Sequence, residues 1–434
     1  MLTFWRGRIR WVLVGWIFVM SAVAYLDRVN ISIAGHYIEE EFHLTHMQLG
    51  WIFSAFVVGY ALFQAPGGRL ADRFGARWVL AGAALWWGIF TSLTATIPAG
   101  IAGALLVLLA VRFLLGAGEA VVYPASNQLV ANWIPTAERG AANGLIFAGV
   151  GVGAGITPPI ITYIMLRGGW RLSFWVCAIL GLVAGGIWFV LARQTPQEHP
   201  WVSALELDKI RAGLTGDQSR KAEPLPWKRI FTSKDVLIIT YSYFCYGYSA
   251  YMFFTWFFIY LSTVRGLNLR ESSYYSMAPF LAMAVGSPLG GVLSDFLTRR
   301  RSKRLGRCGI AVFGIGFAAV FIALGSTVAS PRLASLVLAG GAGALYLSQS
   351  SFWSVTADIA GKSAGSVSGV MNMGGQFGGA VTASLTPLIA THFGWSVSFL
   401  VAALLCATGS VAWLFVDPNR ELAPNPLPAH ARDN

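Results

Sequence analysis

Apolar residues in this chain come in long blocks separated by short polar segments. The blocks run to about 20 residues or more, the length an α-helix needs to cross the hydrocarbon core of a membrane. The pattern therefore predicts twelve transmembrane helices, with approximate bounds 11–34, 48–71, 78–97, 101–124, 140–166, 172–192, 235–262, 272–296, 307–327, 332–357, 364–391 and 395–416.

One connection is much longer than the others. Residues 193–234 are polar and contain eight Lys or Arg and four Pro, as expected of a linker between two groups of helices. We predict an all-α membrane protein with twelve transmembrane helices in two pseudo-symmetric six-helix bundles. Its parts are an N-terminal bundle at 1–192, a cytoplasmic linker at 193–234, a C-terminal bundle at 235–416 and a cytoplasmic tail at 417–434.

Composition and charge agree with a membrane protein. Hydrophobic residues make up 56% of the 434 residues and charged residues 12%, about half the roughly 25% of a soluble domain. This excludes a disordered chain, a coiled coil and a typical soluble enzyme. The net charge of +12 would indicate a nucleic-acid partner in a soluble protein, but here the basic residues follow the connections between spans, so no such partner is expected.

The distribution of basic residues predicts the orientation. With a cytoplasmic N-terminus, 24 of the 31 Lys and Arg fall on the cytoplasmic side and five on the opposite side. The positive-inside rule therefore puts both termini in the cytoplasm. The first block, with three upstream arginines and the Ala22-Val23-Ala24 sequence, also resembles a cleavable signal peptide. The apolar character continues to Ala34, which favours a retained span.

The two halves repeat each other. Gly67-Gly68-Arg69-Leu70-Ala71-Asp72 recurs as Gly290-Gly291-Val292-Leu293-Ser294-Asp295, and Gly169-Trp170 recurs as Gly394-Trp395, at offsets of 223 and 225. Chance similarity between glycine-rich membrane helices is the alternative. Two homologous halves of the same orientation predict a binding site near the midplane between them.

The segment Gly68–Arg77 resembles the signature loop of the major facilitator superfamily, with Ala76 in place of a basic residue. The resemblance covers nearly the whole chain and implies alternating access by rocking of the halves. Asp72 at a helix end can pair with an arginine or a helix dipole in one state only, as a conformational latch. Topology-setting charges alone are the alternative. The latch residues are then Gly68, Asp72, Arg73, Gly75, Arg77 and, in the second copy, Asp295.

Four charged residues fall well within the predicted spans: Asp27, Arg28, Arg112 and Glu119. Each would cost roughly 2.5 to 3.5 kcal/mol if unpaired in mid-bilayer, so they must pair or face water. Arg112 and Glu119 are two helical turns apart, on one face, whereas Asp27 and Arg28 diverge by about 100° and need different partners. The pattern predicts a cavity that binds an anion and exchanges protons; two structural ion pairs between spans 1 and 4 are the alternative.

These four residues resemble those of the anion:cation symporter family, which includes hexonate and hexuronate transporters. The resemblance implies that Arg28 or Arg112 contacts a substrate carboxylate and that Asp27 and Glu119 are the proton-coupling pair. It also implies that Tyr25 and Tyr60 are polar contacts. Gln64 lies one turn after Tyr60, on the same face.

The C-terminal half has no Lys or Arg within a span, so its part of the site must be uncharged. Its polar candidates lie on spans 7, 10 and 11, where simple interhelical hydrogen bonding is the alternative role. Tyr246 and Gln349 are among these candidates, and from the whole set we predict Tyr248, Tyr251, Ser350, Asn372 and Gln376 as substrate contacts. The resemblance supports Asn372, which matches an asparagine of the sugar-acid transporters.

Together these features predict a proton-coupled symporter of the bacterial inner membrane. We expect it to be monomeric, to act without cofactor or metal, and to import an organic anion, a monocarboxylic sugar acid of the hexonate or hexuronate type. A sodium-coupled or exchange carrier for another anion, such as a dicarboxylate or organophosphate, is the alternative. A membrane enzyme or a non-transporting sensor is disfavoured, because the sequence has no metal-ligand spacing, nucleophile elbow or signalling domain.

Overall fold

The computed structural model describes residues 8–214, 225–257 and 260–422. Parts of the predicted linker (215–224), of span 7 (258–259) and of the tail (423–434) lie outside the described residues. The helices of the N-terminal half are α1 (Ile9–Phe42), α2 (His46–Phe74), α3 (Ala76–Thr96), α4 (Ala104–Glu119), α5 (Val122–Trp133) and α6 (Arg139–Leu191). Helix α6 holds two predicted spans, because Gly168 and Gly169 leave the helical conformation between them.

The C-terminal half repeats this order. Its helices are α9 (Lys234–Thr255), α11 (Leu269–Arg300), α12 (Ile310–Thr327), α13 (Pro331–Leu347), α14 (Gln349–Ala360), α15 (Ala364–Phe393) and α16 (Trp395–Ala412). Short helices α7 (Ala204–Gly213) and α8 (Trp227–Thr232) lie in the linker, and the turns η1 (Thr136–Glu138) and η4 (Leu305–Gly309) precede α6 and α12. Each of the twelve predicted spans therefore corresponds to a helix, a helix pair or one arm of α6.

Ten stretches of the described residues are long and apolar enough to cross a membrane, and one of them, 331–393, contains two predicted spans. The predicted span outside this set is α9, whose sequence is interrupted by tyrosines and serines. A span that is polar on one side is expected where a helix faces a cavity rather than lipid. The chain is a multi-pass, all-helical membrane protein.

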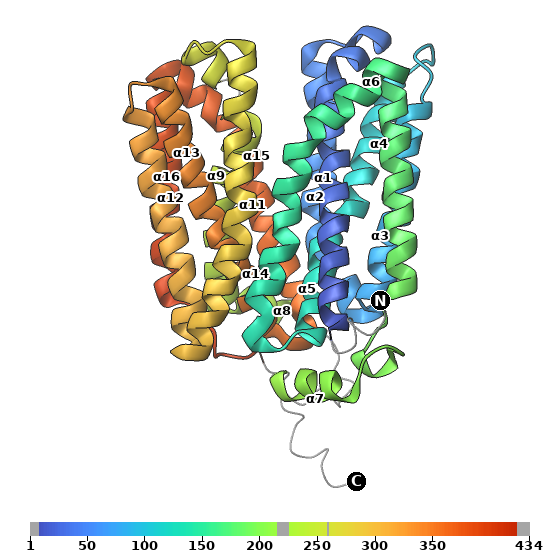
Figure 1. The fold of residues 1–434 in the computed structure, drawn as a ribbon. Helices are drawn as coiled ribbons and strands as arrows, with labels where there is room; N and C mark the ends of the chain where they lie inside the picture. Colours follow the sequence, from blue (N-terminus) through green and yellow to red (C-terminus); the bar gives the residue numbers. More distant parts are fainter. Residues whose placement is uncertain (1–7, 215–224, 258–259, 423–434) are drawn as a thin grey trace.

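The two halves stand side by side, with α7 below one end of them (Figure 1). We call this end the linker side and the other the far side. Helices α6 and α11 pack together across the halves, as do α2 and α15. On the linker side the backbones nearly touch: a Cβ on Gly68 would lie 1.9 Å from the Gly365 carbonyl oxygen, and a Cβ on Gly291 2.1 Å from that of Gly140. Gly68 and its repeat Gly291 thus each allow a close backbone contact between the two halves.

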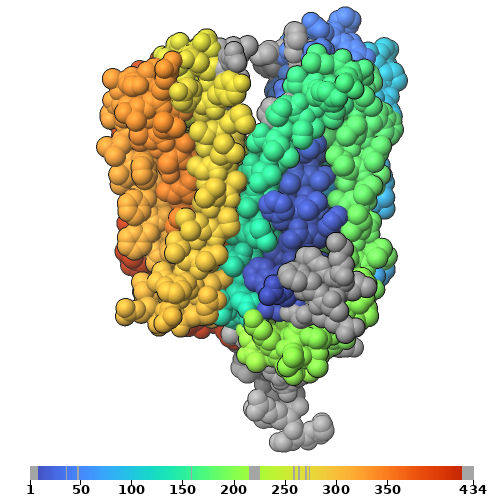
Figure 2. All heavy atoms as spheres, viewed as in Figure 1, coloured from blue at the N-terminus to red at the C-terminus, as the bar shows by residue number. Residues whose placement is uncertain are grey.

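Toward the far side the halves separate. A Cβ on Gly151 of α6 would lie 2.8 Å from Ala284 of α11, whereas one on Gly155, a turn further, would have nothing within 4 Å. Figure 2 shows the same divergence, with the halves in contact at the linker side and parted at the far side. The molecule is closed on the linker side and opens toward the far side.

Helix α7 is attached to the N-terminal half by one buried carboxylate, which the sequence did not predict. Glu206 accepts hydrogen bonds from the backbone N–H groups of Ile9 and Arg10, both at 3.1 Å, and from the Arg10 guanidinium at 3.0 Å. A negative charge at the N-terminus of α1 also complements the dipole of that helix. Helix α7 of the linker is therefore fixed to the N-terminal half.

On the far side, Glu41 connects the end of α1 to the bend in α6. Its carboxylate accepts a hydrogen bond from the Trp170 indole at 2.7 Å and is paired with Arg171. Partial burial alone would raise the pKa of Glu41, but the hydrogen bonds from Arg171 and Trp170 outweigh it and hold the pKa below the usual value of 4.5. The contact therefore stabilises the fold only while Glu41 is ionised.

This predicts a difference in acid stability between the wild type and Glu41→Gln. A lowered pKa contributes stability above the unfolded-state pKa, and the contribution is lost as the pH falls through the folded-state value. In detergent, the melting temperature of the wild type should fall more steeply than that of the variant between about pH 5 and pH 3. Parallel curves for the two proteins would contradict this role of Glu41.

Candidate functional site: a cavity between the halves

Spans 4 and 10 are each broken near the middle of the molecule. Helix α4 ends at Glu119 and α5 begins at Val122, while α13 ends at Leu347 and α14 begins at Gln349. In the first break Pro124 has no N–H to donate to the carbonyl of Ala120, which interrupts the helical hydrogen bonds. Discontinuous helices at the midplane are typical of substrate sites in transporters. The breaks put Glu119 in one half and Gln349 in the other at the centre of the molecule.

Arg28 contacts the acid at the first of these breaks. Its guanidinium is paired with Glu119 at 3.2 Å and donates a hydrogen bond to the Tyr25 hydroxyl at 3.4 Å. It also lies over the Tyr60 ring, 4.3 Å from the ring centroid, in a cation–π contact. The Arg28 side chain is 16% exposed, against 1% for Glu119. Arg28 is thus held by one carboxylate and three aromatic rings, those of Tyr25, Phe56 and Tyr60, with part of its surface open.

Asp27 faces away from Arg28, as the helical geometry predicts. Its carboxylate accepts a hydrogen bond from Thr91 at 2.9 Å, and Arg112 lies within electrostatic range of both Asp27 and Glu119. Asp27 and Arg112 are fully buried inside the N-terminal half. Of the four membrane charges, therefore, only Arg28 keeps solvent access in this state, and Asp27, Arg112 and Glu119 are buried.

Several buried polar atoms of this cluster have no hydrogen-bond partner among the described residues. They are Asp27 Oδ1, Arg28 Nε, Glu119 Oε1, Arg112 Nε and Arg112 Nη1. Unpaired buried atoms of ionisable groups are costly, so each is a place where a proton or a ligand atom lowers the free energy. The cluster has the capacity to accept protons on either acid.

A central cavity of about 460 Å³, part of it open to solvent, lies between the two halves. Tyrosines dominate its wall, and none of its lining residues is charged. The N-terminal half contributes Tyr25, Tyr60, Tyr123, Phe147 and Val150. The C-terminal half contributes Tyr243, Tyr246, Gly247, Ala250, Tyr251, Phe254, Tyr346, Gln349, Asn372, Gly375 and Gln376. Arg28 lies directly behind Tyr25 and Tyr60, so the nearest cation is one layer from the cavity.

The uncharged sequence-predicted contacts divide into two groups, and the predicted Arg28 and Arg112 are not among the lining residues. Tyr25, Tyr60, Tyr251, Asn372 and Gln376 line the cavity, whereas Gln64, Tyr248 and Ser350 are buried and do not line it.

The lining residues of the C-terminal half also bond to one another and to the other half. Tyr251 donates to Gln376 Oε1 at 2.6 Å, and Asn372 donates across the halves to Gln64 Oε1 at 2.8 Å. Tyr243 and Tyr346 were not among the predicted candidates. Their only sequence signal was their position near the polar residues of spans 7 and 10.

The repeated aspartates cap helices of the opposite half. Asp72 accepts hydrogen bonds from the backbone N–H groups of Gly365 (2.9 Å) and Ser366 (2.7 Å), at the start of α15. Asp295 accepts from Gly140 (2.9 Å) and Ala141 (2.6 Å), at the start of α6. A carboxylate at a helix N-terminus satisfies free N–H groups and complements the dipole. Each half thus holds the other through its copy of the same motif.

The basic latch residues do not share this arrangement. Arg77 donates to the Phe189 carbonyl at 3.2 Å within the N-terminal half, and Arg73 is exposed with its guanidinium near the Phe74 ring. Gly75 has a φ of 81°, in the tight turn between α2 and α3. Arg73, Gly75 and Arg77 therefore build the local turn, and Gly68 and Asp72 make the contact between the halves.

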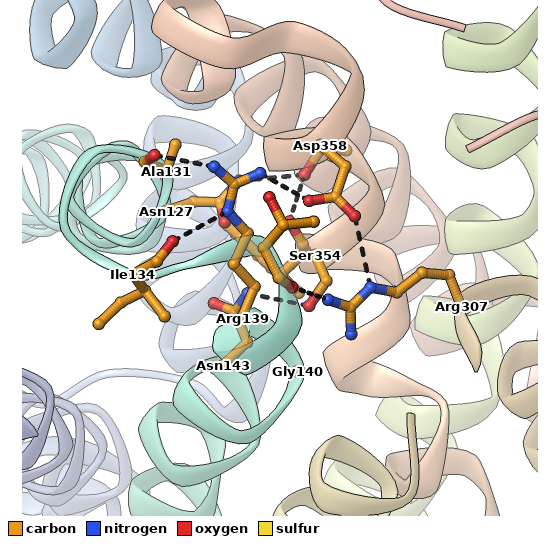
Figure 3. Close-up of polar contacts among 12 residues, drawn as sticks. Asn127, Ala131, Ile134, Arg139, Gly140, Asn143, Arg307, Ser354 and Asp358 are labelled. Atoms are coloured by element: carbon orange, nitrogen blue, oxygen red, sulfur yellow. Dashed lines mark hydrogen bonds and ion pairs between the residues drawn. The ribbon is translucent and has the colours of Figure 1, made fainter. Parts of the chain in front are cut away.

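A buried charge network on the linker side was not predicted from the sequence. Figure 3 shows Arg139, Asp358 and Arg307 of this network. Asp358 of α14 pairs with Arg139 of α6 at 2.6 Å and with Arg307 at 3.4 Å, and Arg307 pairs with Asp295 at 2.7 Å. We call these four residues the linker-side network. They sit at predicted span ends, where their charges resembled ordinary topology signals. Because Arg139 belongs to one half and the other three to the second, the network holds the linker side closed.

Two halves closed at one end around a polar cavity define a transporter of the alternating-access class. The Major Facilitator Superfamily sequence model matches residues 17–383 and 365–432, so the chain belongs to this family of transporters, and it is not an enzyme.

Relatives of the chain carry organic anions. It is 36% identical over 417 residues to the "Probable sulfoacetate transporter SauU" of Cupriavidus necator, covering 95% of each chain. It is 31% identical over 408 residues to the "Hexuronate transporter" of Bacillus subtilis, covering 93% of each. Its fold matches the proton:xylose symporter XylE, bound to 6-bromo-6-deoxy-D-glucose, with a TM-score of 0.75 at 15% identity, covering 95% of this chain and 97% of that one.

The linker-side network predicts that Asp358→Asn opens the linker side. The change leaves two buried guanidinium groups without that carboxylate, and breaking a buried pair costs about 3–5 kcal/mol. In a background without native cysteines, Ser354→Cys, buried at the contact with Asn143, should react with a maleimide at least about tenfold faster when Asp358→Asn is added.

The matched control is Asp235→Asn. Asp235 pairs with Arg420 at 3.3 Å on the same side, within the C-terminal half, so its loss should leave the labelling rate unchanged. Equal rates in the two backgrounds would contradict a closing role for Asp358.

Proposed function

We propose that the protein is a proton-coupled symporter that imports a monocarboxylic sugar acid, a hexonate or hexuronate, across a bacterial inner membrane. The observation that carries this proposal is the Arg28–Glu119 pair at the margin of the cavity. One guanidinium cannot hold an internal carboxylate and a substrate carboxylate equally well, so protonation of the first favours binding of the second. Its relatives, carriers of hexuronate and other organic anions, support the substrate class.

The orientation proposed from the basic residues puts the linker side in the cytoplasm, with both termini. The described state then faces outward, with its cytoplasmic side closed by Asp72, Asp295 and the linker-side network. A monomer is sufficient for this scheme, because both halves of the cavity come from one chain. The binding partners are the organic anion, protons and the lipid bilayer.

The proposed cycle begins with proton entry from outside. A proton on a Glu119 carboxylate oxygen removes the negative charge that Glu119 presents to Arg28. Asp27 is the second proton site, and Arg112 lies within electrostatic range of both acids. The freed Arg28 then binds the substrate carboxylate, with Tyr25 and Tyr60 beside it. Tyr251, Asn372 and Gln376 face the remainder of the substrate. The two halves then rock so that the cavity opens to the cytoplasm, and the proton leaves. The ionised Glu119 pairs with Arg28 again, which displaces the substrate anion.

We expect Glu119→Gln to uncouple transport from protons. A glutamine cannot carry a charge, so Arg28 is free at every pH, and binding no longer depends on protonation. In proteoliposomes, accumulation of D-glucuronate driven by a pH gradient should be lost, while exchange of internal for external substrate stays within about threefold of wild type.

The control is Asp208→Asn, an acid-to-amide change on the exposed face of α7, which should transport normally. If Glu119→Gln and Asp27→Asn both still accumulated substrate under a pH gradient, neither acid would be part of the coupling.

A second candidate is a carrier for a short dianion. The 36% identity to the sulfoacetate transporter favours it, and so does Arg112 as a second cation close to Arg28. Sodium coupling or exchange are the alternative driving forces. These cases are separated by measuring uptake driven by a pH gradient in sodium-free buffer, with sulfoacetate, D-glucuronate and D-glucarate as competitors. Preference for D-glucuronate supports the sugar-acid proposal. Preference for sulfoacetate supports the dianion carrier.

A further inference from the structure

The wall of the cavity in the C-terminal half contains a tyrosine whose hydroxyl is poorly hydrogen-bonded. Tyr243 and Tyr246 stack on one another with ring centroids 5.0 Å apart and an interplanar angle of 2°. The Tyr243 hydroxyl accepts hydrogen bonds from Gln349 at 3.0 Å and Trp353 at 3.3 Å. The Tyr246 hydroxyl makes no well-formed hydrogen bond among the described residues, although Tyr246 is only 4% exposed and lines the cavity. Its polar neighbour there is the Tyr346 hydroxyl, which interacts with it from the same half.

The surroundings of this hydroxyl are polar but uncharged. The Tyr346 ring lies 5.8 Å from the Tyr246 ring, and Gln349 is the first residue of α14, directly after the break that follows α13. A buried hydroxyl without a matching hydrogen bond is unfavourable. A cavity-lining phenol of this kind is therefore a position where a ligand's own polar group lowers the free energy.

The charge distribution decides which ligand group fits. The only partly exposed cation of the site, Arg28, is on the N-terminal side of the cavity, and the cavity-lining residues of the C-terminal half are phenols, amides and apolar groups. A second anionic group placed there would lose its water without gaining a cation, which is strongly unfavourable. An uncharged hydroxyl loses little and can both donate to and accept from a phenol.

We infer that Tyr246, supported by Tyr346 and Gln349, forms a subsite that binds a hydroxyl group of the substrate and selects hydroxylated anions over anions without hydroxyls. The inference rests on the proposed function and adds to it a specificity-determining residue. A site built to hydrogen-bond a hydroxyl discriminates strongly against an analogue that lacks it, because the protein group is then left unpaired. Size alone discriminates far less.

The experiment is a double-mutant cycle between protein and ligand in proteoliposomes. Uptake of labelled D-glucuronate is inhibited with unlabelled D-glucuronate and with each of its monodeoxy analogues. In the wild type, at least one deoxy analogue should inhibit about tenfold more weakly than D-glucuronate. In Tyr246→Phe, inhibition by D-glucuronate should weaken by about the same factor. Inhibition by that deoxy analogue should stay as it is in the wild type, because the hydrogen bond that the substitution removes is one the analogue already lacks.

The matched control is Tyr248→Phe. Tyr248 lies two residues along the same helix, is fully buried and also has a hydroxyl without a partner, but it does not line the cavity. It should leave the whole inhibition series unchanged. Thermal melts of Tyr246→Phe should match the wild type, since the lost hydroxyl makes no well-formed hydrogen bond in the described part of the chain, and this separates selectivity from misfolding.

Two results would overturn the subsite while leaving anion symport intact. One is a Tyr246→Phe protein that keeps the full wild-type discrimination among the deoxy analogues. The other is a wild type that takes up sulfoacetate under a pH gradient and does not prefer D-glucuronate to it. Absence of pH-driven uptake for every anion tested would instead remove the proposed function, and the subsite with it.

Discussion

A guanidinium inside a membrane protein needs a negative partner, and it can satisfy only one fully at a time. Arg28 has Glu119 as that partner, three aromatic rings around it, and part of its surface open beside the central cavity. The pair is held by the break after α4, which puts Glu119 at the centre of the molecule. In the proposed cycle, every step depends on this competition, because a proton on the acid and an anion on the guanidinium each favour the other.

The linker side uses the same constraint for a different purpose. Asp72 and Asp295 each cap a helix of the opposite half, and the glycines four residues before them let the backbones meet. These contacts are available only while the halves are closed at this end, so they stabilise one conformation selectively. The second copy adds Arg307, Asp358 and Arg139, which makes the contact between α11 and α6 the more strongly charged of the two. The two copies therefore share the same helix-capping geometry but differ in the number of ion pairs that hold the halves together.

The sequence was sufficient for the twelve spans, the repeat and the divergence of Asp27 from Arg28, because helix length and the 100° step between residues determine them. It was not sufficient for the wall of the C-terminal half. Tyr248 was preferred to Tyr246, and Ser350 to Gln349, although the latter of each pair lines the cavity. A helix that is buried on most sides has no polar face to fix its rotation. Arg139 and Arg307 were missed because a basic residue at a span end looks the same whether it faces lipid headgroups or the other half.

The central claim is that the substrate replaces Glu119 on Arg28 only when the acid is protonated. It is tested most directly by counting protons when D-glucuronate binds to the purified protein near neutral pH, by calorimetry in buffers of different ionisation enthalpy. The account predicts uptake of about one proton for each anion bound in the wild type, because binding and protonation are linked. Saturable binding with no net proton uptake would contradict it.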